Sequence, residues 1–258
     1  MKAASIPAAA PGGPRIVFLV GEGEYESDRT MLPVADRMQA ELGAEVVYRT
    51  PDVLEDMPDF PEQSYGDLSA LADADLLVVY TRWRQLPDEE MRHIAEFCER
   101  GGSVLGLRTS NHAFHYPEGS RWEEWNDRFG RETLGSPWIS HHGHSSSTDV
   151  RWADDGGHPI LSGLPRSFHL RSWLYRTDLS EGCTPILWGE PVDPENESTP
   201  SAVAWTWERE GRRTVYTNMG HPSDLRQSIV HDFLVNAARW CMRLPEAGHG
   251  PFGAEQSG

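Results

Sequence analysis

An alternation of apolar strands and amphipathic helices over the first 107 residues limits the folds open to this chain. Continuous or nearly continuous apolar runs predict strands buried on both faces of a sheet. Four such runs occur, at residues 15–20 (RIVFLV), 45–49 (EVVYR), 75–80 (DLLVVY) and 103–107 (SVLGL). Between them, residues 28–42 and 88–100 repeat apolar side chains at helical spacing, and each segment ends at a glycine. This order predicts an α/β domain with a mostly parallel sheet and helices on both of its faces.

The second half of the chain is less regular but still contains strand and helix patterns. Helices are expected at residues 121–134 and 224–242. Strands are expected at residues 148–152, 185–188, 202–207 and 213–217. No feature marks a boundary between domains, so we expect one domain over residues 14–244. A disordered leader of residues 1–13 and a flexible tail of residues 245–258 would flank this domain.

The acidic charge balance argues against nucleic-acid and membrane partners. The chain has 23 basic and 40 acidic residues, a net charge of −17, and such a field repels phosphate backbones and anionic membrane surfaces. No apolar run approaches the roughly 20 residues that a membrane helix needs. The first residues lack the apolar segment of an intact secretory signal, so the expected location is cytoplasmic, or exported if a signal peptide was removed. Cys98, Cys183 and Cys241 are too few for a disulfide framework and are expected to be small buried hydrophobes.

Charged, imidazole and aromatic side chains follow the predicted strands, at the places where α/β folds bind ligands. In an open parallel sheet, ligands bind beyond the carboxyl ends of the strands. The candidate side chains in these loops are Glu22, Glu24, Arg82, Trp83, Arg84, Arg108, His112, His115, His221 and Asp224. Since these loops share one edge of the sheet, we expect them to form a single site.

The loop after the first strand, GEGEYE, resembles a dinucleotide-binding turn only in part. It lacks the third glycine, and its glutamates would repel a pyrophosphate, so a nucleotide site is rejected. Glu22, directly after the strand, better suits sugar hydroxyls, a cation or proton transfer. Glu24 and Glu26 could equally be charges at the start of a helix.

Arg108 stands where a strand turns into a helix, the place of the nucleophile in a nucleophile elbow. Arginine stays protonated and cannot act as a nucleophile, but it can hold a carboxylate, a carbonyl oxygen or an enolate. Ser110 lacks the expected glycine frame and is interpreted as a helix cap. His112 and His115 would be neighbours on one helix face.

The densest histidine cluster lies in residues 139–144 (ISHHGH). If this segment is extended, His142 and His144 point the same way and His141 points the other way. Two imidazoles on one side suit a divalent metal such as zinc or manganese, and they equally suit hydrogen bonds to a polyol. The third metal ligand would come from one of three residues elsewhere in the chain, His112, His221 or Glu22.

Some of the ten tryptophans are candidates for sugar binding, because an indole face packs against the apolar face of a sugar ring. Most of the ten are expected in the core, because they lie in strand or helix patterns. Those near the candidate loops are Trp83, Trp122, Trp125 and Trp138.

Several stretches taken together resemble the trehalose-utilisation ThuA-like family of the class I glutamine amidotransferase-like superfamily. They are FLVGEGEYESD, DADLLVVYTRWRQLP, GGSVLGLRTSNHAF, LGSPWISHHGHSSSTDVRW, HPILSGLP and AVAWTWEREGRRTVYTNMGHPSD. The resemblance implies a flavodoxin-like sheet with its site at the elbow. The amidotransferase cysteine is replaced by Arg108, so glutamine hydrolysis is not expected. The family's recurrent polar positions match Glu22, Arg82, Arg84, Arg108, His112, His144 and His221. The resemblance also implies disaccharide utilisation through keto-sugars made by a partner dehydrogenase.

Two hypotheses follow for the function. In the first, the protein is an enzyme acting on a keto-glycoside: His112 or His221 is the base, Arg108 stabilises the oxyanion, and Glu22 binds a hydroxyl or transfers a proton. A metal on His142 and His144 could replace Arg108 as the electrophile. The expected substrate contacts are Glu24, Arg82, Trp83, Arg84, His115, Trp138 and Asp224. In the second, the protein is a non-catalytic sugar-binding or regulatory module. A peptidase or deglycase would need a cysteine or serine at the elbow. A homodimer is expected only from the general frequency of symmetric dimers.

Overall fold

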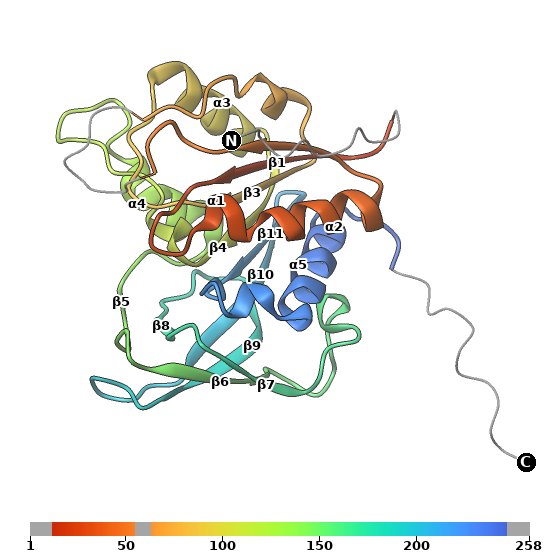
Figure 1. Cartoon of the computed structure of the whole chain (residues 1–258). Coiled ribbons are helices and arrows are strands. Elements are labelled where there is room, and N and C mark those ends of the chain that lie inside the picture. The colour runs from red at the N-terminus through yellow and green to blue at the C-terminus, as the bar shows by residue number, and fades with distance from the viewer. Residues whose placement is uncertain (1–11, 55–62, 247–258) are drawn as a thin grey trace, which may run out of the picture.

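A single mixed sheet organises the described part of the chain, residues 12–54 and 63–246 of the computed structural model. Within these residues the sheet has nine strands (Figure 1). Their order is β2 (Glu45–Arg49), β1 (Arg15–Val20), β3 (Leu76–Tyr80), β4 (Ser103–Leu107), β11 (Arg212–Thr217), β10 (Ser201–Arg209), β9 (Cys183–Val192), β6 (Ser147–Trp152) and β7 (Ser167–Leu170). The first five strands pair in parallel and the remaining pairs are antiparallel. The predicted α/β, flavodoxin-like fold is confirmed, with an antiparallel extension on one side of the parallel strands.

Helices cover both faces of the parallel strands, as predicted. The main helices are α2 (Leu32–Leu42), α3 (Asp88–Glu99), α4 (Trp125–Arg128) and α5 (Ser228–Cys241). In Figure 1, α3 lies on one side of β1 and β3, while α2 and α5 lie on the other. Ile16, Phe18 and Val20 pack in the cluster of α2 and α5, whereas Val17 and Leu19 pack in the cluster of α3. Alternate side chains of a strand point to opposite faces, so a strand covered on both faces has to be apolar throughout.

The helix expected at residues 28–42 is broken in two. The chain forms α1 (Ser27–Thr30) and then α2, with Met31 between them. Pro33 lacks the N–H that would continue the helical hydrogen bonds across this point. It is tolerated because it stands in the first turn of α2.

Two other expected helices are shorter than the sequence pattern suggests. Residues 121–134 give only α4 and a π-helical turn, η3 (Phe129–Leu134), which ends at Gly135 with φ 87°. The final helix begins at Ser228 rather than at residue 224, because Gln227 is extended (φ −88°, ψ 131°) and follows the short turn η5 (Asp224–Arg226). The carboxylate of Asp224 accepts hydrogen bonds from a distant loop, which holds this turn outside the helix.

The expected strands of the second half are present, and three short ones were missed. Those missed are β7, β5 (Ser140–His141) and β8 (Tyr175–Arg176), and the last two form a small separate sheet. All three cysteines are free; Cys98 and Cys241 are buried as expected, whereas Cys183 is only half-buried. Among the described residues, no helix is long and apolar enough to span a membrane. Most of the expected leader and tail, residues 1–11 and 247–258, lies outside the described residues.

Candidate functional site

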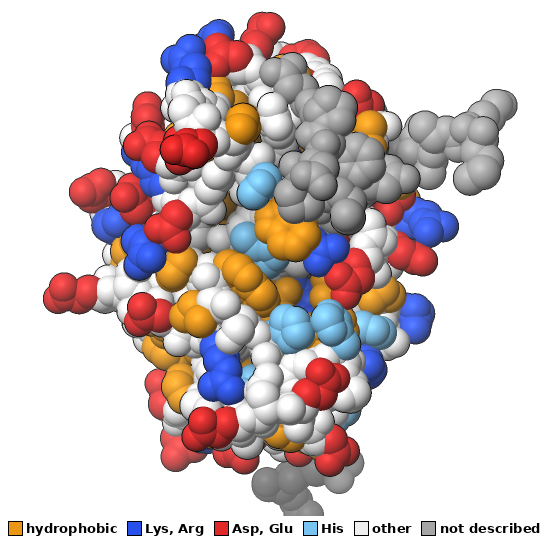
Figure 2. Space-filling model, turned by 90° about the vertical axis from the view of Figure 1, so that its left-hand side faces the viewer, with side chains coloured by type: hydrophobic (Ala, Val, Ile, Leu, Met, Phe, Trp, Pro, Cys, Tyr) orange, Lys and Arg blue, Asp and Glu red, His pale blue; other side chains and the backbone are white. Residues whose placement is uncertain are grey.

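The loops after β1, β3, β4 and β11 meet at one edge of the sheet, because parallel strands end on the same side. Figure 2 faces this edge, and histidine and hydrophobic side chains gather near its centre beside arginine and acidic groups. We call it the carboxyl-edge site. The site is defined by Glu22, Glu24, Tyr25, Arg82, Trp83, Arg108, His112, Trp138, His141, His144, Trp173, Tyr175, Asn218 and His221, which are linked by the contacts described below.

Arg108 lies at the centre of the carboxyl-edge site and is fully buried. It follows β4 with a positive φ of 44°, a conformation that is strained for a residue with a side chain and that resembles the turn of a nucleophile elbow. Its Nη1 donates to the carbonyl oxygens of Asn218 (2.8 Å) and Trp173 (3.2 Å). Its Nε and Nη2 are buried and have no hydrogen-bond partner among the described residues.

Three aromatic rings enclose the Arg108 guanidinium. Its Cζ lies 4.7 Å from the ring centroid of Tyr25, 4.3 Å from that of Trp173 and 4.6 Å from that of Tyr175, which is the geometry of cation–π contacts. Burial raises the pKa of both tyrosines, so neither is an anionic counterion. The site therefore contains a buried positive charge that is balanced by ring faces and carbonyl dipoles.

Glycine at position 220 allows the Arg108 side chain to lie where it does. A Cβ at this position would lie 2.5 Å from Oη of Tyr80 and 3.2 Å from Cδ of Arg108. The Tyr80 hydroxyl donates to the carbonyl oxygen of Gly220 at 2.8 Å. The loop after β11 can approach β3 and Arg108 this closely only without a side chain at this position.

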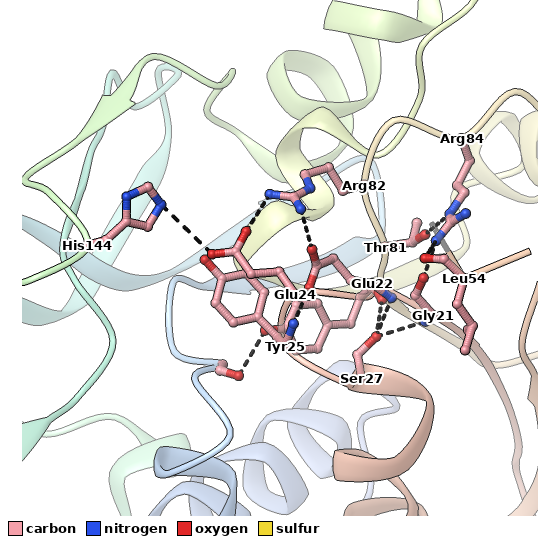
Figure 3. Close-up of polar contacts among 12 residues, drawn as sticks. Gly21, Glu22, Glu24, Tyr25, Ser27, Leu54, Thr81, Arg82, Arg84 and His144 are labelled. Atoms are coloured by element: carbon pink, nitrogen blue, oxygen red, sulfur yellow. Dashed lines mark hydrogen bonds and ion pairs between the residues drawn. The ribbon is translucent and has the colours of Figure 1, made fainter. Parts of the chain in front are cut away.

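A chain of alternating charges runs along one side of the carboxyl-edge site (Figure 3). Arg82 bridges two carboxylates, with Nη2 at 2.8 Å from Glu22 and Nη1 at 2.9 Å from Glu24. The other Glu22 oxygen accepts the backbone N–H of Tyr25 at 2.7 Å. The second Glu24 oxygen lies 3.8 Å from Nε2 of His144. The Glu22 side chain is fully buried whereas that of Glu24 is 35% exposed, so Glu24 is the carboxylate that a ligand can reach.

The ring nitrogens of His112 and His221 have opposite roles. Nδ1 of His112 lies 2.7 Å from the amide oxygen of Asn111, which only accepts, so Nδ1 carries the proton and Nε2 carries the lone pair. Nδ1 of His221 accepts the backbone N–H of Ser223 at 3.1 Å, so the neutral ring has its proton on Nε2. Burial lowers the pKa of His221, which keeps the ring neutral at pH 7 although Asp224 acts against this shift. In their neutral forms, His112 suits a base and His221 suits a hydrogen-bond donor.

Aromatic rings connect His112 to the cage around Arg108. The centroid of the His112 ring lies 5.9 Å from that of the Trp83 ring and 4.6 Å from that of the Trp138 ring. Trp138 in turn lies 4.8 Å from Tyr175, a member of the cage. The predicted residues Trp83, Trp138 and His112 are therefore neighbours, as a stacking surface for a sugar requires.

Arg84 is buried as part of the scaffold, contrary to the expectation that it contacts substrate. Its guanidinium donates to the carbonyl oxygens of Gly21, Val53 (2.9 Å) and Leu54 (3.1 Å). These bonds tie the loop after β1 to the loop after β2. The fully buried Arg84 side chain therefore fixes the position of these loops.

Asp224 and His115 also lie outside the carboxyl-edge site. The Asp224 carboxylate is fully buried and accepts the backbone N–H groups of Arg171 (2.7 Å) and Ser172 (2.8 Å). His115 is exposed and follows the short turn η2 (Arg108–His112). Its backbone N–H donates to the carbonyl oxygen of Arg84. The expectation that His115 and His112 share a helix face is wrong, because the helical turn ends at His112.

The expectation that His142 and His144 point the same way is also wrong. Gly143 has a φ of 103° and turns the chain between them. The His142 side chain is fully buried. Burial is the main cause that lowers its pKa, and the nearby positive charge of Arg176 lowers it further. The His144 side chain is 64% exposed and packs against the ring of His141 at 4.6 Å. In the described ranges no three histidine, cysteine, aspartate or glutamate side chains converge as metal ligands. These two histidines do not fit a shared metal.

Five residues of the site were missed by sequence reasoning. Asn218 contributes a carbonyl oxygen, which no side-chain pattern reveals. Trp173 and Tyr175 alternate in the sequence WLY, the spacing of two side chains on one face of an extended segment. Tyr25 lies within the glutamate loop, and His141 contacts Trp138, Trp173 and Tyr175. For Tyr25, Trp173 and Tyr175, the signal that could have found them is the aromatic content near the candidate loops.

Comparisons with known proteins agree with this architecture. The model of the ThuA family, described as trehalose utilisation, matches residues 19–241. A protein from Parabacteroides merdae described as ThuA-like superposes with a TM-score of 0.63 at 18% identity, covering 89% of this chain and 90% of that one. A cytoplasmic protein from Salmonella typhimurium LT2 gives 0.54 at 12% identity, covering 88% and 99%.

A third solved structure is much longer than this chain. The carbohydrate deacetylase Agd3 gives a TM-score of 0.53 at 15% identity, covering 92% of this chain but 33% of that one. No curated protein matches the chain in sequence. At these identities the solved structures show a common fold.

Proposed function

Because the chain belongs to the ThuA family of trehalose utilisation, we propose that it is a carbohydrate-active enzyme that removes a proton beside the ketone of a keto-glycoside. The carboxyl-edge site has the groups that such a substrate needs. The rings of Trp83 and Trp138 offer apolar faces for a sugar ring. Glu24 and Arg82 offer an acceptor and donors for hydroxyl groups. The fold is also found in a carbohydrate deacetylase, which is consistent with a sugar ligand.

The observation that carries this proposal is the hydrogen bonding of two imidazoles on loops at the carboxyl edge: Asn111 fixes the proton of neutral His112 on Nδ1, and Ser223 fixes that of neutral His221 on Nε2. A proton-abstracting enzyme needs a lone pair near the carbon and donors near the oxygen. His112 supplies the lone pair on Nε2, and His221 supplies an N–H on Nε2. Arg108 is fully buried in this structure, so it acts as a fixed positive charge behind the aromatic rings.

The proposed reaction begins with transfer of a proton from carbon to Nε2 of His112. The C–H electron pair becomes the double bond of an enolate, and the former ketone oxygen takes the negative charge. The N–H of His221 and the field of Arg108 stabilise this oxyanion. For isomerisation, His112 returns its proton to the former ketone carbon while the hydrogen of the neighbouring hydroxyl moves to the oxyanion, so that the C=O bond re-forms one carbon away. For elimination, the enolate electrons re-form the ketone and a C=C bond as the glycosidic C–O bond breaks, and His112 gives its proton to the departing oxygen. A partner dehydrogenase would supply the ketone.

The alternative is a sugar-binding or regulatory module without turnover. It is favoured by the complete burial of Glu22 and Arg108, two of the residues expected to touch substrate. Both are occupied within the protein: Glu22 holds Arg82, and Arg108 holds the turn after β11. The two functions make different predictions for proton exchange.

Proton exchange in heavy water tests the proposal. We expect the wild-type protein to accelerate loss of the hydrogen beside the ketone of 3-keto-trehalose, followed by NMR. His112→Asn should slow this exchange at least about 100-fold, the usual contribution of a general base. His169→Asn is the matched control, because His169 pairs with Asp149 on the antiparallel extension. Saturable binding without accelerated exchange would favour the binding module, and full exchange by His112→Asn would refute the assigned base.

A further inference from the structure

A cavity lies at the opposite edge of the sheet from the carboxyl-edge site. It has a volume of about 460 Å³ and lies between the end of α5, the start of β11 and the turn η4 (Pro159–Leu161). Arg213, near the start of β11, lines this cavity, whereas the end of the same strand leads to Asn218 in the carboxyl-edge site. A strand of this length separates the two places by roughly 15–20 Å. We infer that this arginine cavity binds a small anion that carries a phosphate group.

Three guanidinium groups and one carboxylate line the arginine cavity: Arg213, Arg239, Arg243 and Glu246. In the described part of the chain only Arg213 forms an ion pair, with Glu208 at 3.1 Å. This excess of positive charge is unusual in a chain with a net charge of −17.

The other two arginines have only neutral partners in the described residues. Arg239 donates from Nη1 to the carbonyl oxygen of Pro245 at 3.1 Å and from Nη2 to that of Glu41 at 3.4 Å. Arg243 donates from Nη2 to the carbonyl oxygen of Gly211 at 3.0 Å. Nε of Arg239 is buried without a hydrogen-bond partner in this part of the chain. Each guanidinium carries five N–H groups, so donors remain for an anion.

The walls of the arginine cavity are held in place before any ligand arrives. Asn236 on α5 donates both amide hydrogens to the η4 segment, at 3.1 Å to the carbonyl oxygen of Ile160 and 3.0 Å to that of Ser162. The Trp240 ring is fixed between the Arg213 guanidinium at 4.5 Å and the His158 ring at 5.2 Å. A preformed site loses less conformational entropy on binding.

Phosphate is the anion that best matches this lining. Guanidinium groups bind phosphate oxygens through paired N–H bonds, and several arginines around one cavity can share a dianion. The cavity volume is within the range of small-molecule sites, roughly 300–1,000 Å³. The carbonyl end of α5 opposes an anion, but Arg213 already donates to the carbonyl oxygen of Trp240 at 3.0 Å and offsets that dipole.

Isothermal titration of the full chain tests this inference with inorganic phosphate and glucose 6-phosphate, and with glucose as the uncharged control. We expect one saturable phosphate site per chain with a dissociation constant below about 1 mM, and no heat from glucose. Arg239→Gln and Arg243→Gln should each weaken binding about tenfold or more. Arg166→Gln is the matched control, because Arg166 is an exposed arginine stacked on Trp152 at 4.4 Å.

The outcomes separate a specific site from general charge attraction. Tighter binding of glucose 6-phosphate than of phosphate would identify a sugar phosphate as the ligand, and equal binding would identify free phosphate. The inference is overturned if phosphate does not saturate below about 10 mM, or if Arg166→Gln weakens binding as much as the two cavity variants do. Thermal melts of each variant show that it folds. Arg243 is exposed, so its variant tests the cavity even if Arg239→Gln is unstable.

Discussion

The buried charge of Arg108 should contribute to catalysis through its electric field rather than by contact. The centroid of the Trp173 ring lies 4.3 Å from Cζ of Arg108, and an oxyanion on the far side of this ring would lie one ring spacing beyond the centroid. At roughly 8 Å and an effective dielectric constant of about 20, a unit charge stabilises it by about 2 kcal/mol. Removing the charge should therefore slow proton abstraction about 30-fold.

Two substitutions separate the charge of Arg108 from its shape. Arg108→Met keeps the length of the side chain and removes the charge, so kcat/KM for exchange on 3-keto-trehalose should fall about 30-fold with little change in KM. Arg108→Lys keeps the charge and should retain most of the rate. Both variants leave carbonyl groups near position 108 with fewer donors, which costs about 1–3 kcal/mol of stability and shows as a lower Tm.

The assay is deuterium exchange by NMR, together with a thermal melt of each variant at the same pH. Equal exchange rates in the wild type and Arg108→Met would refute the electrostatic role. Equal losses in Arg108→Met and Arg108→Lys would show that the shape of the guanidinium matters and its charge does not. A rise in KM with unchanged kcat would assign Arg108 to binding.

Three further results are expected. Gly220→Ala should lower Tm by several degrees, because the new Cβ would lie 2.5 Å from a tyrosine hydroxyl and such overpacking costs about 1–3 kcal/mol. Gly156→Ala is the control and should leave Tm unchanged, because its Cβ would have its nearest contact at 3.4 Å. Glu24→Gln should raise KM for a sugar ligand more than it lowers kcat; the reverse would make Glu24 an acid or base. Burial lowers the pKa of His141 and His221 below 6.5, so the unfolded chain binds more protons than the folded chain below that pH. The free energy of unfolding, measured by denaturant titration, should therefore fall as the pH drops through this range. A free energy of unfolding that does not change with pH would contradict these pKa shifts.

The position of Arg108 suggests how this fold could work without a nucleophile. The strained turn after β4 is kept, with a positive φ at Arg108, but the side chain there is a cation enclosed by rings. The reactive groups of the proposed mechanism are instead the imidazoles on the loops after β4 and β11. In the proposed mechanism, the carboxyl edge of the sheet would support acid–base chemistry, whereas a nucleophile elbow supports covalent chemistry.

The sequence alone was sufficient for the parallel strands and for the loops that meet at their carboxyl ends. The apolar run RIVFLV is a strand because both faces of β1 are covered, and such burial leaves a local pattern. The position of Arg108 at the turn after β4 follows from the same pattern. Hydrophobic periodicity reports burial within a few residues of chain, so it places these elements correctly.

The tertiary structure alone decided what the polar side chains do. Arg84 and Asp224 stand in the expected loops, yet each binds the backbone of a distant segment. The His112 tautomer depends on its partner Asn111, and His142 is separated from His144 by one glycine turn. For Arg84 and Asp224, the role of the charged group depends on partners from remote parts of the chain, and a local pattern carries no information about those partners.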